Sequence, residues 1–259
     1  MTSLRLTLVQ QASSLDPADN RERAADAVAR AEEGTGLVVL PEAFARDFGA
    51  PDSDLSGDAE PLDGPFVARL TEVARERGTA VVAGMFETSD DPSRPYNTLV
   101  LVDGDGLRAS YRKIHLYDSF GYRESDRLVA GPVEPVLVDV GGFRVGLMTC
   151  YDLRFPELAR ELVARGAELL VVPSAWVAGP AKVEHWRTLV TARAIENTVY
   201  VAAAGQPGPR YSGHSLVVGP DGAVLAGVAD GDHLLSAVVD HDRLAETRAT
   251  NPSLANRRF

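Results

Sequence analysis

The sequence predicts a layered α/β fold whose sheets are mixed rather than purely parallel. In the first third of the chain, short β-branched runs alternate with longer helical stretches, in the order 4–10, 19–33, 37–40, 66–77 and 79–87. Farther along, two segments follow a strand–turn–strand pattern with glycines in the turn. The alternation indicates stacked layers of helices and strands, and the hairpins indicate that antiparallel strands join them.

Local signals mark the ends of the early helices. Asp16-Pro17 places a capping carboxylate before a proline in the first turn, which is where proline fits a helix best. Gly34 and Gly78 follow the last expected helical residues, and glycine is the common residue just past a helix end. We therefore expect the first helix to run over 19–33 and the second over 66–77.

Two β-hairpins are expected, one near the middle of the chain and one in its last quarter. The first joins strands 96–102 and 107–113 through Asp103-Gly104-Asp105-Gly106, and the second joins 215–218 and 223–227 through Gly219-Pro220-Asp221-Gly222. The remaining expected elements are strands and helices in alternation: strand 143–149, helix 156–165, strand 169–172, helix 183–197, strand 199–204, strand 233–239 and a short helix from Asp242.

Bulk composition limits the class of protein. The 259 residues are 45% hydrophobic and contain no repeat or linker, so we expect one domain over 1–259, with 49–64 as a surface loop. A net charge of -11 disfavours nucleic acid and anionic membranes as partners. No run approaches the roughly 20 apolar residues of a membrane span, and residues 1–10 lack a basic leader, which favours a cytoplasmic enzyme.

Cys150 is the only cysteine, so it is either a small buried hydrophobe or a reactive thiol. The count alone favours the buried interpretation. Its position favours the reactive one, because Cys150 follows an apolar strand and Pro156 suggests that a helix begins soon after. Such a corner exposes a side chain and supplies a backbone N–H that can stabilise an oxyanion.

A reactive thiol needs a nearby base or cation, because the thiolate is the attacking species. Glu42 lies just beyond a buried strand, although an acid in that place is more often a cap or a solvated charge. Lys113 ends another strand; side chains alternate there, so either Lys113 or the pair Arg112 and His115 faces the core. No metal site is expected, because the histidines lack partners at ligand spacing.

Three segments together resemble the nitrilase superfamily of carbon-nitrogen hydrolases, in that family's order. They are Leu-Pro-Glu at 40–42, Tyr-Arg-Lys-Ile-His-Leu at 111–116, and Gly-Leu-Met-Thr-Cys-Tyr-Asp-Leu-Arg-Phe-Pro-Glu at 146–157. The resemblance implies Glu42 as general base, Lys113 as the cation that stabilises the tetrahedral intermediate, Cys150 as nucleophile and Glu124 as a second glutamate. It also implies a four-layer α-β-β-α sandwich, a homodimer or higher homo-oligomer, and no metal or cofactor.

Within the superfamily, residues 116–125 and 175–180 look most like deaminated glutathione amidases. That resemblance implies hydrolysis of the amide of deaminated glutathione to 2-oxoglutarate and cysteinylglycine through a thioester. We expect the substrate to contact Tyr117, Tyr151, Arg154 and Trp176, although Arg154 could instead form a structural ion pair, and Tyr117 and Trp176 could equally be core. For the substrate's carboxylates, the candidate cations are Arg154, Lys182 and Arg123.

Three alternatives stay open. The first is an omega-amidase acting on 2-oxoglutaramate or another small aliphatic amide, the second a true nitrilase, and the third a non-catalytic binding protein that kept the fold. The joint presence of Glu42, Lys113 and Cys150 argues against the third.

Overall fold

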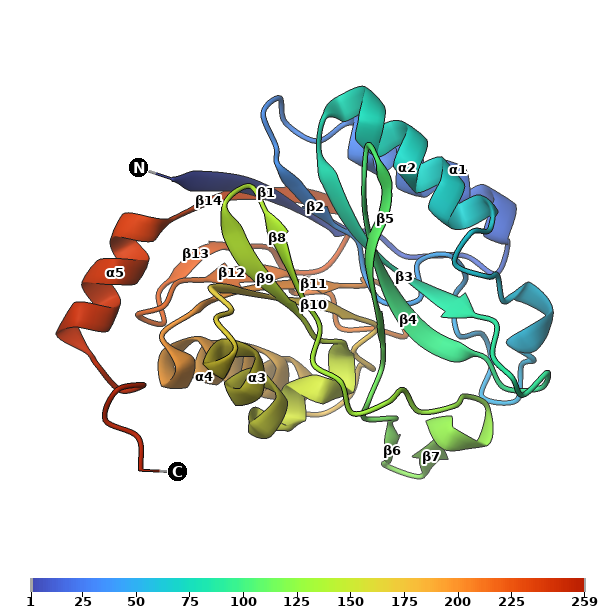
Figure 1. The fold of residues 1–259 in the computed structure, drawn as a ribbon. Helices are drawn as coiled ribbons and strands as arrows, with labels where there is room; N and C mark the ends of the chain where they lie inside the picture. The colour runs from blue at the N-terminus through green and yellow to red at the C-terminus, as the bar shows by residue number, and fades with distance from the viewer. Residues whose placement is uncertain (1, 259) are drawn as a thin grey trace.

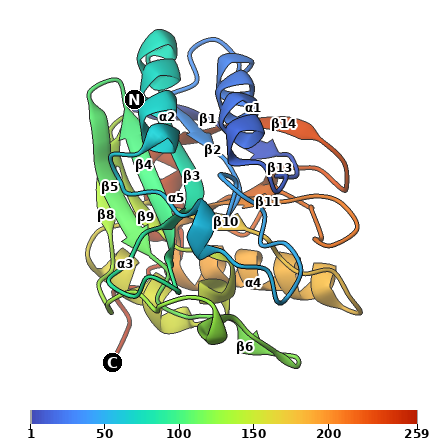
Figure 2. The same ribbon diagram turned by 90° about the vertical axis from the view of Figure 1, so that its right-hand side faces the viewer.

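The structure is a computed structural model that describes residues 2–258, so Met1 and Phe259, the two ends of the expected domain, lie outside it. Two six-stranded sheets stack face to face, and helices cover the outer face of each (Figure 1). The view in Figure 2 shows α1 and α2 side by side over one sheet, with α3 and α4 at the opposite side of the molecule. The predicted four-layer α-β-β-α sandwich with two mixed sheets is confirmed.

The first sheet is parallel at its centre and antiparallel at its edges. Its strands β1, β2 and β3 are parallel, whereas β14, β4 and β5 pair with their neighbours antiparallel. In spatial order the strands are β14 (His233–Asp240), β1 (Ser3–Gln10), β2 (Leu37–Val39), β3 (Ala80–Glu87), β4 (Tyr96–Asp103) and β5 (Gly106–Arg112). Its outer face is covered by α1 (Pro17–Ala29) and α2 (Pro65–Arg77).

The second sheet repeats this plan. Its strands β9, β10 and β11 are parallel, and β8, β12 and β13 are antiparallel to their neighbours. In spatial order they are β13 (Val224–Gly227), β12 (Leu216–Val218), β11 (Tyr200–Gly205), β10 (Leu169–Ser174), β9 (Phe143–Leu147) and β8 (Leu137–Val140). Its outer helices are α3 (Pro156–Ala164) and α4 (Lys182–Asn197).

The remaining elements lie at the edges. Helix α5 (His241–Thr250) follows β14 at the far edge of the stack in Figure 1, and a small hairpin of β6 (Asp118–Ser119) and β7 (Tyr122–Arg123) projects beneath β4 and β5. Three 3-10 turns cover Ser56–Asp58, Glu124–Asp126 and Cys150–Arg154. The longest helix within residues 2–258 is α4 with 16 residues, and none of the described helices has the length and apolarity needed to span a bilayer.

Most predicted element ends are confirmed. The Asp16 carboxylate accepts hydrogen bonds from the N–H groups of Ala18 and Asp19 at the start of α1, and Gly78 closes α2 in the left-handed conformation with φ 60°. The expected end of the first helix at 33 is wrong. The helix stops at Ala29, because the N–H of Arg30 already closes the last turn and residues 30–34 continue as a turn.

Strand β8 was not expected from the sequence. Gly141 and Gly142, with φ values of 56° and 86°, form the two-residue turn that joins it to β9. Two successive glycines are a hairpin signal, because a tight turn of this kind needs positive φ at both central residues. The signal is present in the sequence, but the strand before it is short and half-buried, so its alternation is weak.

The apolar core lies between the sheets. Leu6 and Leu8 from β1 and Val145 and Leu147 from β9 are fully buried in one continuous cluster that spans both sheets. Burial of a side chain of this size is worth about 1.5–3 kcal/mol. The packing therefore fixes the two sheets relative to each other and places the carboxyl ends of β2, β9 and β10 around one cavity.

Candidate active site

Cys150 lies in a strained turn between β9 and α3. It begins the 3-10 turn Cys150–Arg154 and has a φ of 44°, a conformation that costs a non-glycine residue on the order of 1–3 kcal/mol. The predicted corner is therefore present, and Pro156 is the first residue of α3 as expected. The expectation of an exposed side chain is wrong, because Cys150 is only 8% exposed and faces an interior cavity.

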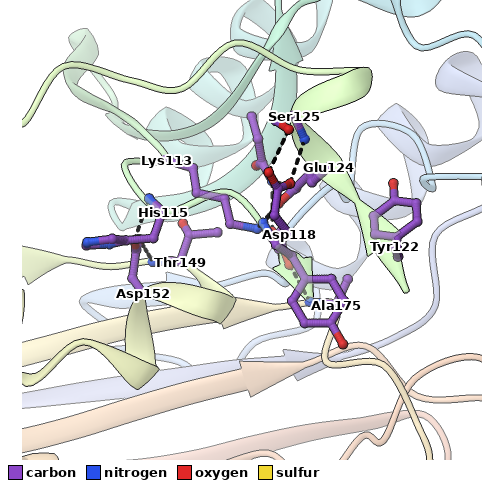
Figure 3. Close-up of polar contacts among 12 residues, drawn as sticks. Lys113, His115, Asp118, Tyr122, Glu124, Ser125, Thr149, Asp152 and Ala175 are labelled. Carbon is purple, nitrogen blue, oxygen red and sulfur yellow. Dashed lines mark hydrogen bonds and ion pairs between the residues drawn. The ribbon is translucent and has the colours of Figure 1, made fainter. Parts of the chain in front are cut away.

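Buried hydrogen bonds hold this turn. The Asp152 carboxylate accepts from the N–H of Thr149 at 2.9 Å, from the hydroxyl of Tyr111 at 2.6 Å, and from the N–H of His115 at 3.2 Å. The ring Nδ1 of His115 also lies 2.7 Å from Asp152 Oδ1, and Figure 3 shows the two residues side by side. The residue two positions after Cys150 is thus tied to the strand end that carries Lys113, which fixes the two segments relative to each other.

Glu42 follows β2 and is 1% exposed. Its Oε2 accepts the N–H of Ala175 at 2.7 Å, and its Oε1 accepts Lys113 Nζ at 2.9 Å. Gly84 makes this position possible, because a Cβ there would lie 2.3 Å from the backbone nitrogen of Ala43. The carboxylate is therefore held on both oxygens at the carboxyl ends of β2 and β10.

Lys113 lies just past the end of β5 and is 2% exposed, so of the two predicted orientations it is Lys113 that faces the interior. Its Nζ lies 2.9 Å from Glu42 Oε1, 2.9 Å from Glu124 Oε2 and 3.1 Å from Glu124 Oε1. Figure 3 shows Lys113 extended toward Glu124. Burial alone would lower the pKa of Lys113, but the charges of Glu124 and Glu42 outweigh burial and hold that pKa well above its usual value. The side chain is a permanent cation.

Glu124 begins the 3-10 turn after the β6–β7 hairpin and is 1% exposed. Besides Lys113, it accepts the N–H of Tyr117 at 2.5 Å. Burial raises the pKa of the Glu124 carboxyl, Lys113 opposes that change, and the nearby Glu42 charge adds to it, so that the pKa stays above its ordinary value. The structure therefore brings Glu42, Lys113 and Glu124 together as one buried charge cluster.

Cys150 completes the cluster as a neutral thiol. Burial raises the pKa of the thiol well above its usual value, and the Glu42 charge raises it further, whereas Lys113 only partly opposes them. Because the thiolate is the nucleophilic form, the proton must leave as the sulfur attacks. Glu42 is the nearby carboxylate whose charge acts most strongly on this thiol.

A cavity of about 430 Å³ opens above this cluster. Of the predicted substrate contacts, Tyr117, Tyr151, Arg154 and Trp176 all line it. The rings of Tyr117 and Tyr151 pack edge to face, with their centroids 5.0 Å apart. Trp176 is 4% exposed and also packs on the core tryptophan Trp186. The core interpretation of Trp176 is therefore correct as well, since one face packs inward and the residue still lines the cavity.

Two of the three predicted cations reach the cavity. Arg154 lies over the Trp176 ring at 4.9 Å, and Lys182 donates to the Tyr117 hydroxyl at 3.1 Å and lies 3.7 Å from the centre of the Phe120 ring. Neither has a carboxylate at ion-pair distance within residues 2–258, so the structural ion pair considered for Arg154 is not formed there. Burial and the charge of Arg154 lower the pKa of Lys182.

The prediction that the third cation, Arg123, lies at the pocket is wrong. Its side chain is 68% exposed, pairs with Asp126 at 3.4 Å, and does not line the cavity. It lies on β7, where successive side chains point to opposite sides, and its neighbour Tyr122 takes the inward position.

Several wall residues were not identified from the sequence. Arg127 donates to the carbonyls of Phe48 and Ser53 and to the hydroxyl of Tyr122, so it fastens the 48–53 loop to the β6–β7 hairpin. The expected surface loop 49–64 thus contributes to the cavity. The wall residues that were not predicted from the sequence come from four separate segments: Phe48, Gly49, Pro51, Phe120, Tyr122, Arg127, Ala175, Val177, Ala178, Gly179, Pro180, Arg210 and Tyr211. Only those at 120, 122, 175 and 177–180 fall in segments that carried the family resemblance.

Comparison with known sequences places the chain in a family. The model of the carbon-nitrogen hydrolase family matches residues 5–249. A deaminated glutathione amidase of Escherichia coli is 43% identical over 93% of this chain and 92% of its own. An omega-amidase of Homo sapiens is 37% identical over 100% of this chain and 96% of its own.

Solved structures agree. A carbon-nitrogen hydrolase superfamily protein of Xanthomonas campestris, with an arsenic adduct in its active site, is 31% identical with a TM-score of 0.89 over 100% of this chain and 99% of that one. An amidase mutant of Nesterenkonia, with the acetamide moiety of fluoroacetamide bound covalently to its active-site cysteine, is 32% identical with a TM-score of 0.82 over 99% and 94%. The chain therefore belongs to the carbon-nitrogen hydrolase family of the nitrilase superfamily.

Proposed function

We propose that this protein is an amidase that hydrolyses the amide of deaminated glutathione to 2-oxoglutarate and cysteinylglycine. The observation that carries the proposal is the buried cluster of Cys150, Glu42, Lys113 and Glu124 at the base of a cavity. It supplies a nucleophile, a base and a fixed cation within one site. The name of the Escherichia coli relative supports the choice of amide.

The reaction would begin with the neutral thiol. As the Cys150 sulfur attacks the amide carbonyl carbon, Glu42 accepts the thiol proton, and the oxygen of the tetrahedral intermediate gains negative charge. The Lys113 ammonium is the cation available to stabilise that oxygen, and a backbone N–H of the Cys150 turn is a further candidate. Glu42 then returns the proton to the nitrogen, the carbon–nitrogen bond breaks, and the amine of cysteinylglycine leaves.

The second half of the reaction would hydrolyse the thioester. Glu42 removes a proton from water as the water oxygen attacks the thioester carbon, and Lys113 again faces the developing oxyanion. The carbon–sulfur bond breaks, the proton returns to sulfur, and 2-oxoglutarate is released. In this scheme Glu124 keeps Lys113 protonated and in place, since two of the three short contacts of the ammonium are to Glu124.

Charge in the cavity favours an acidic amide over a neutral one. Arg154 and Lys182 line the wall without an acid partner in the described chain, although the protein as a whole carries a net charge of -11. Two neighbouring cations repel each other, and a substrate carboxylate between them would relieve that repulsion. Deaminated glutathione carries such carboxylates.

The second candidate is an omega-amidase acting on 2-oxoglutaramate. The similarity to the human omega-amidase over the whole chain supports it. That substrate has the same acyl end and releases ammonia instead of a dipeptide, so the roles proposed for Cys150, Glu42 and Lys113 do not change. Only the part of the cavity that would hold the leaving amine distinguishes the two candidates.

The test is a comparison of kcat/KM for deaminated glutathione and 2-oxoglutaramate, with products identified by mass spectrometry and Cys150→Ala as the inactive control. A higher kcat/KM for deaminated glutathione is expected. A clear preference for 2-oxoglutaramate would move the assignment to the second candidate. No product from either compound, or from a panel of other amides and nitriles, would overturn the proposal in favour of a binding role.

We further propose that residues 1–259 work as one catalytic domain, because the cavity wall draws on residues from Glu42 to Tyr211. The proposed setting is the cytoplasm, with a homodimer as the working form. Light scattering coupled to size exclusion would measure the oligomer directly, and a monomer at the concentration of the activity assay would contradict the dimer.

A further inference from the structure

Asn97 lies next to both buried carboxylates of the site, outside the cavity wall. It is 1% exposed and belongs to β4. Its Nδ2 donates to Glu42 Oε1 at 2.8 Å and to Glu124 Oε1 at 3.3 Å. These two oxygens are also the ones that contact Lys113 Nζ, so the neutral amide and the ammonium bridge the same pair of carboxylates.

The backbone of Asn97 is tied to the same site. Its carbonyl accepts the N–H of Lys113 at 2.8 Å, one residue beyond the ladder that pairs Thr98 with Arg112. Asn97 therefore contacts three of the four clustered residues, Lys113 through its main chain and the two glutamates through its side chain.

The amide orientation follows from charge. A reversed amide would place Oδ1 against two carboxylate oxygens, so only the donor orientation gives attraction to both. In that orientation Oδ1 is buried and has no hydrogen-bond partner among residues 2–258. A buried acceptor without a partner costs free energy, and a hydrophobic residue would avoid that cost. The donor to the carboxylates is the feature that offsets it.

We propose that Asn97 is a positioning residue, which bridges Glu42 and Glu124 and fixes their places, so that Glu42 can accept the Cys150 proton while Glu124 stays with Lys113. It acts through those residues and touches no substrate. The charged and titratable groups that face Glu42 are Lys113, Glu124 and Cys150. The inference rests on the proposed role of Glu42 as general base.

Loss of the amide donor should change the charge balance of the carboxylate pair as well as the position of Glu42. A hydrogen bond to the ionised form lowers the pKa of a carboxyl, so loss of the Asn97 donor should raise the pKa of Glu124, which burial and the Glu42 charge already raise. Activity that needs the carboxylates of the cluster ionised should then begin at a higher pH. A role in folding alone would lower stability and leave the pH profile where it was.

The matched control is Thr98, the next residue on β4. Its hydroxyl donates to the buried Glu87 carboxylate at 2.7 Å, and its side chain points away from the cavity. Thr98→Val removes a buried donor to one carboxylate outside the cluster, whereas Asn97→Ala removes a buried donor shared by the two carboxylates of the cluster. Both variants should lose stability.

The experiment compares wild type, Asn97→Ala, Asn97→Asp and Thr98→Val by thermal melting and by pH profiles of kcat/KM on 2-oxoglutaramate. Asn97→Ala should lose about 100-fold in kcat with little change in KM, and its acidic limb should move up by about one pH unit. Asn97→Asp keeps the shape but replaces the donor with an acceptor, so its loss should be larger. Thr98→Val should keep the wild-type pH profile.

A second measurement needs no turnover. The pH profile of the rate at which iodoacetamide alkylates Cys150 should move up by about one pH unit in Asn97→Ala, as the acidic limb of kcat/KM does. A folded Asn97→Ala protein with wild-type pH dependence in both measurements would overturn the inference. If no amide is hydrolysed but the alkylation shift is present, the proposed function fails and the role of Asn97 stands.

Discussion

Removal of the Lys113 cation should destabilise the fold as well as stop catalysis. In Lys113→Met, Glu42 and Glu124 keep their buried positions and lose three contacts of 2.9–3.1 Å to the ammonium. Breaking a buried ion pair on one side costs about 3–5 kcal/mol, because a charge stays behind without a partner. For a chain of this length about 4 kcal/mol corresponds to a loss of roughly 10 °C in Tm.

The sign of the pH dependence follows from the same charges. Lys113 has a raised pKa in the folded state, so its stabilising effect in the wild type persists through neutral pH and is lost only as pH rises through that raised value. In the variant, the buried Glu124 carboxyl loses the cation that opposes the rise of its pKa, so it would take up a proton more readily in the folded state than in the unfolded state. The variant should therefore be less destabilised near pH 5 than near pH 8.

The assay is chemical denaturation of wild type and Lys113→Met at both pH values, with Lys113→Met/Glu124→Gln as a matched double variant. The double variant buries one charge fewer and should recover about 2 kcal/mol. A loss below about 1 kcal/mol in Lys113→Met, equal at both pH values, would refute the assignment of Lys113 as the neutralising cation of two buried carboxylates.

Three further changes test other parts of the site. Alkylation of Cys150 by iodoacetamide should be slow at pH 7 and rise steeply above pH 9, because burial raises the pKa of the thiol; a flat rate between these values would contradict a neutral resting thiol. Gly84→Ala places a Cβ 2.3 Å from the Ala43 nitrogen and should cost about 3 kcal/mol or more in unfolding free energy, together with most of the activity, whereas a wild-type melt would show that the Glu42 loop can move aside. Lys182→Met should raise KM about tenfold for an acidic amide but not for a neutral one. The control is Arg123→Ala, which removes a solvated cation and should leave the KM of both amides unchanged. An equal effect of Lys182→Met on the two substrates would argue against a carboxylate site.

The sequence was most informative where short-range chemistry decides the outcome. The Asp16 cap, Gly78 and the two glycine turns depend on residues within a few positions of one another, and the structure agrees with each of them. The predicted end of the first helix was wrong because Gly34, with its positive φ, belongs to the following turn and not to the helix terminus.

At the candidate site, the sequence predicted some residues and not others. Glu42, Lys113 and Cys150 are each ambiguous alone, and the order of their motifs was needed to connect them. Asn97 had no signal, because it becomes important only through a strand pairing that brings residue 97 beside 113 and through packing that brings 42 and 124 to the same place. Arg123 and Lys182 were equal candidates for a cation that binds the substrate's carboxylates. Side chains alternate along β7, and that alternation points Arg123 outward, whereas Lys182 lies at the start of α4 and lines the cavity.

By itself the sequence determined the alternation of strands and helices, the mixed character of the sheets and the identity of the single thiol, because these follow from local periodicity, turn residues and composition. Only the tertiary structure decided that the thiol is buried and neutral, that two glutamates share one lysine, and which cations reach the cavity. These properties depend on desolvation and on distances between residues far apart in the chain, and both arise only when the two sheets pack against each other.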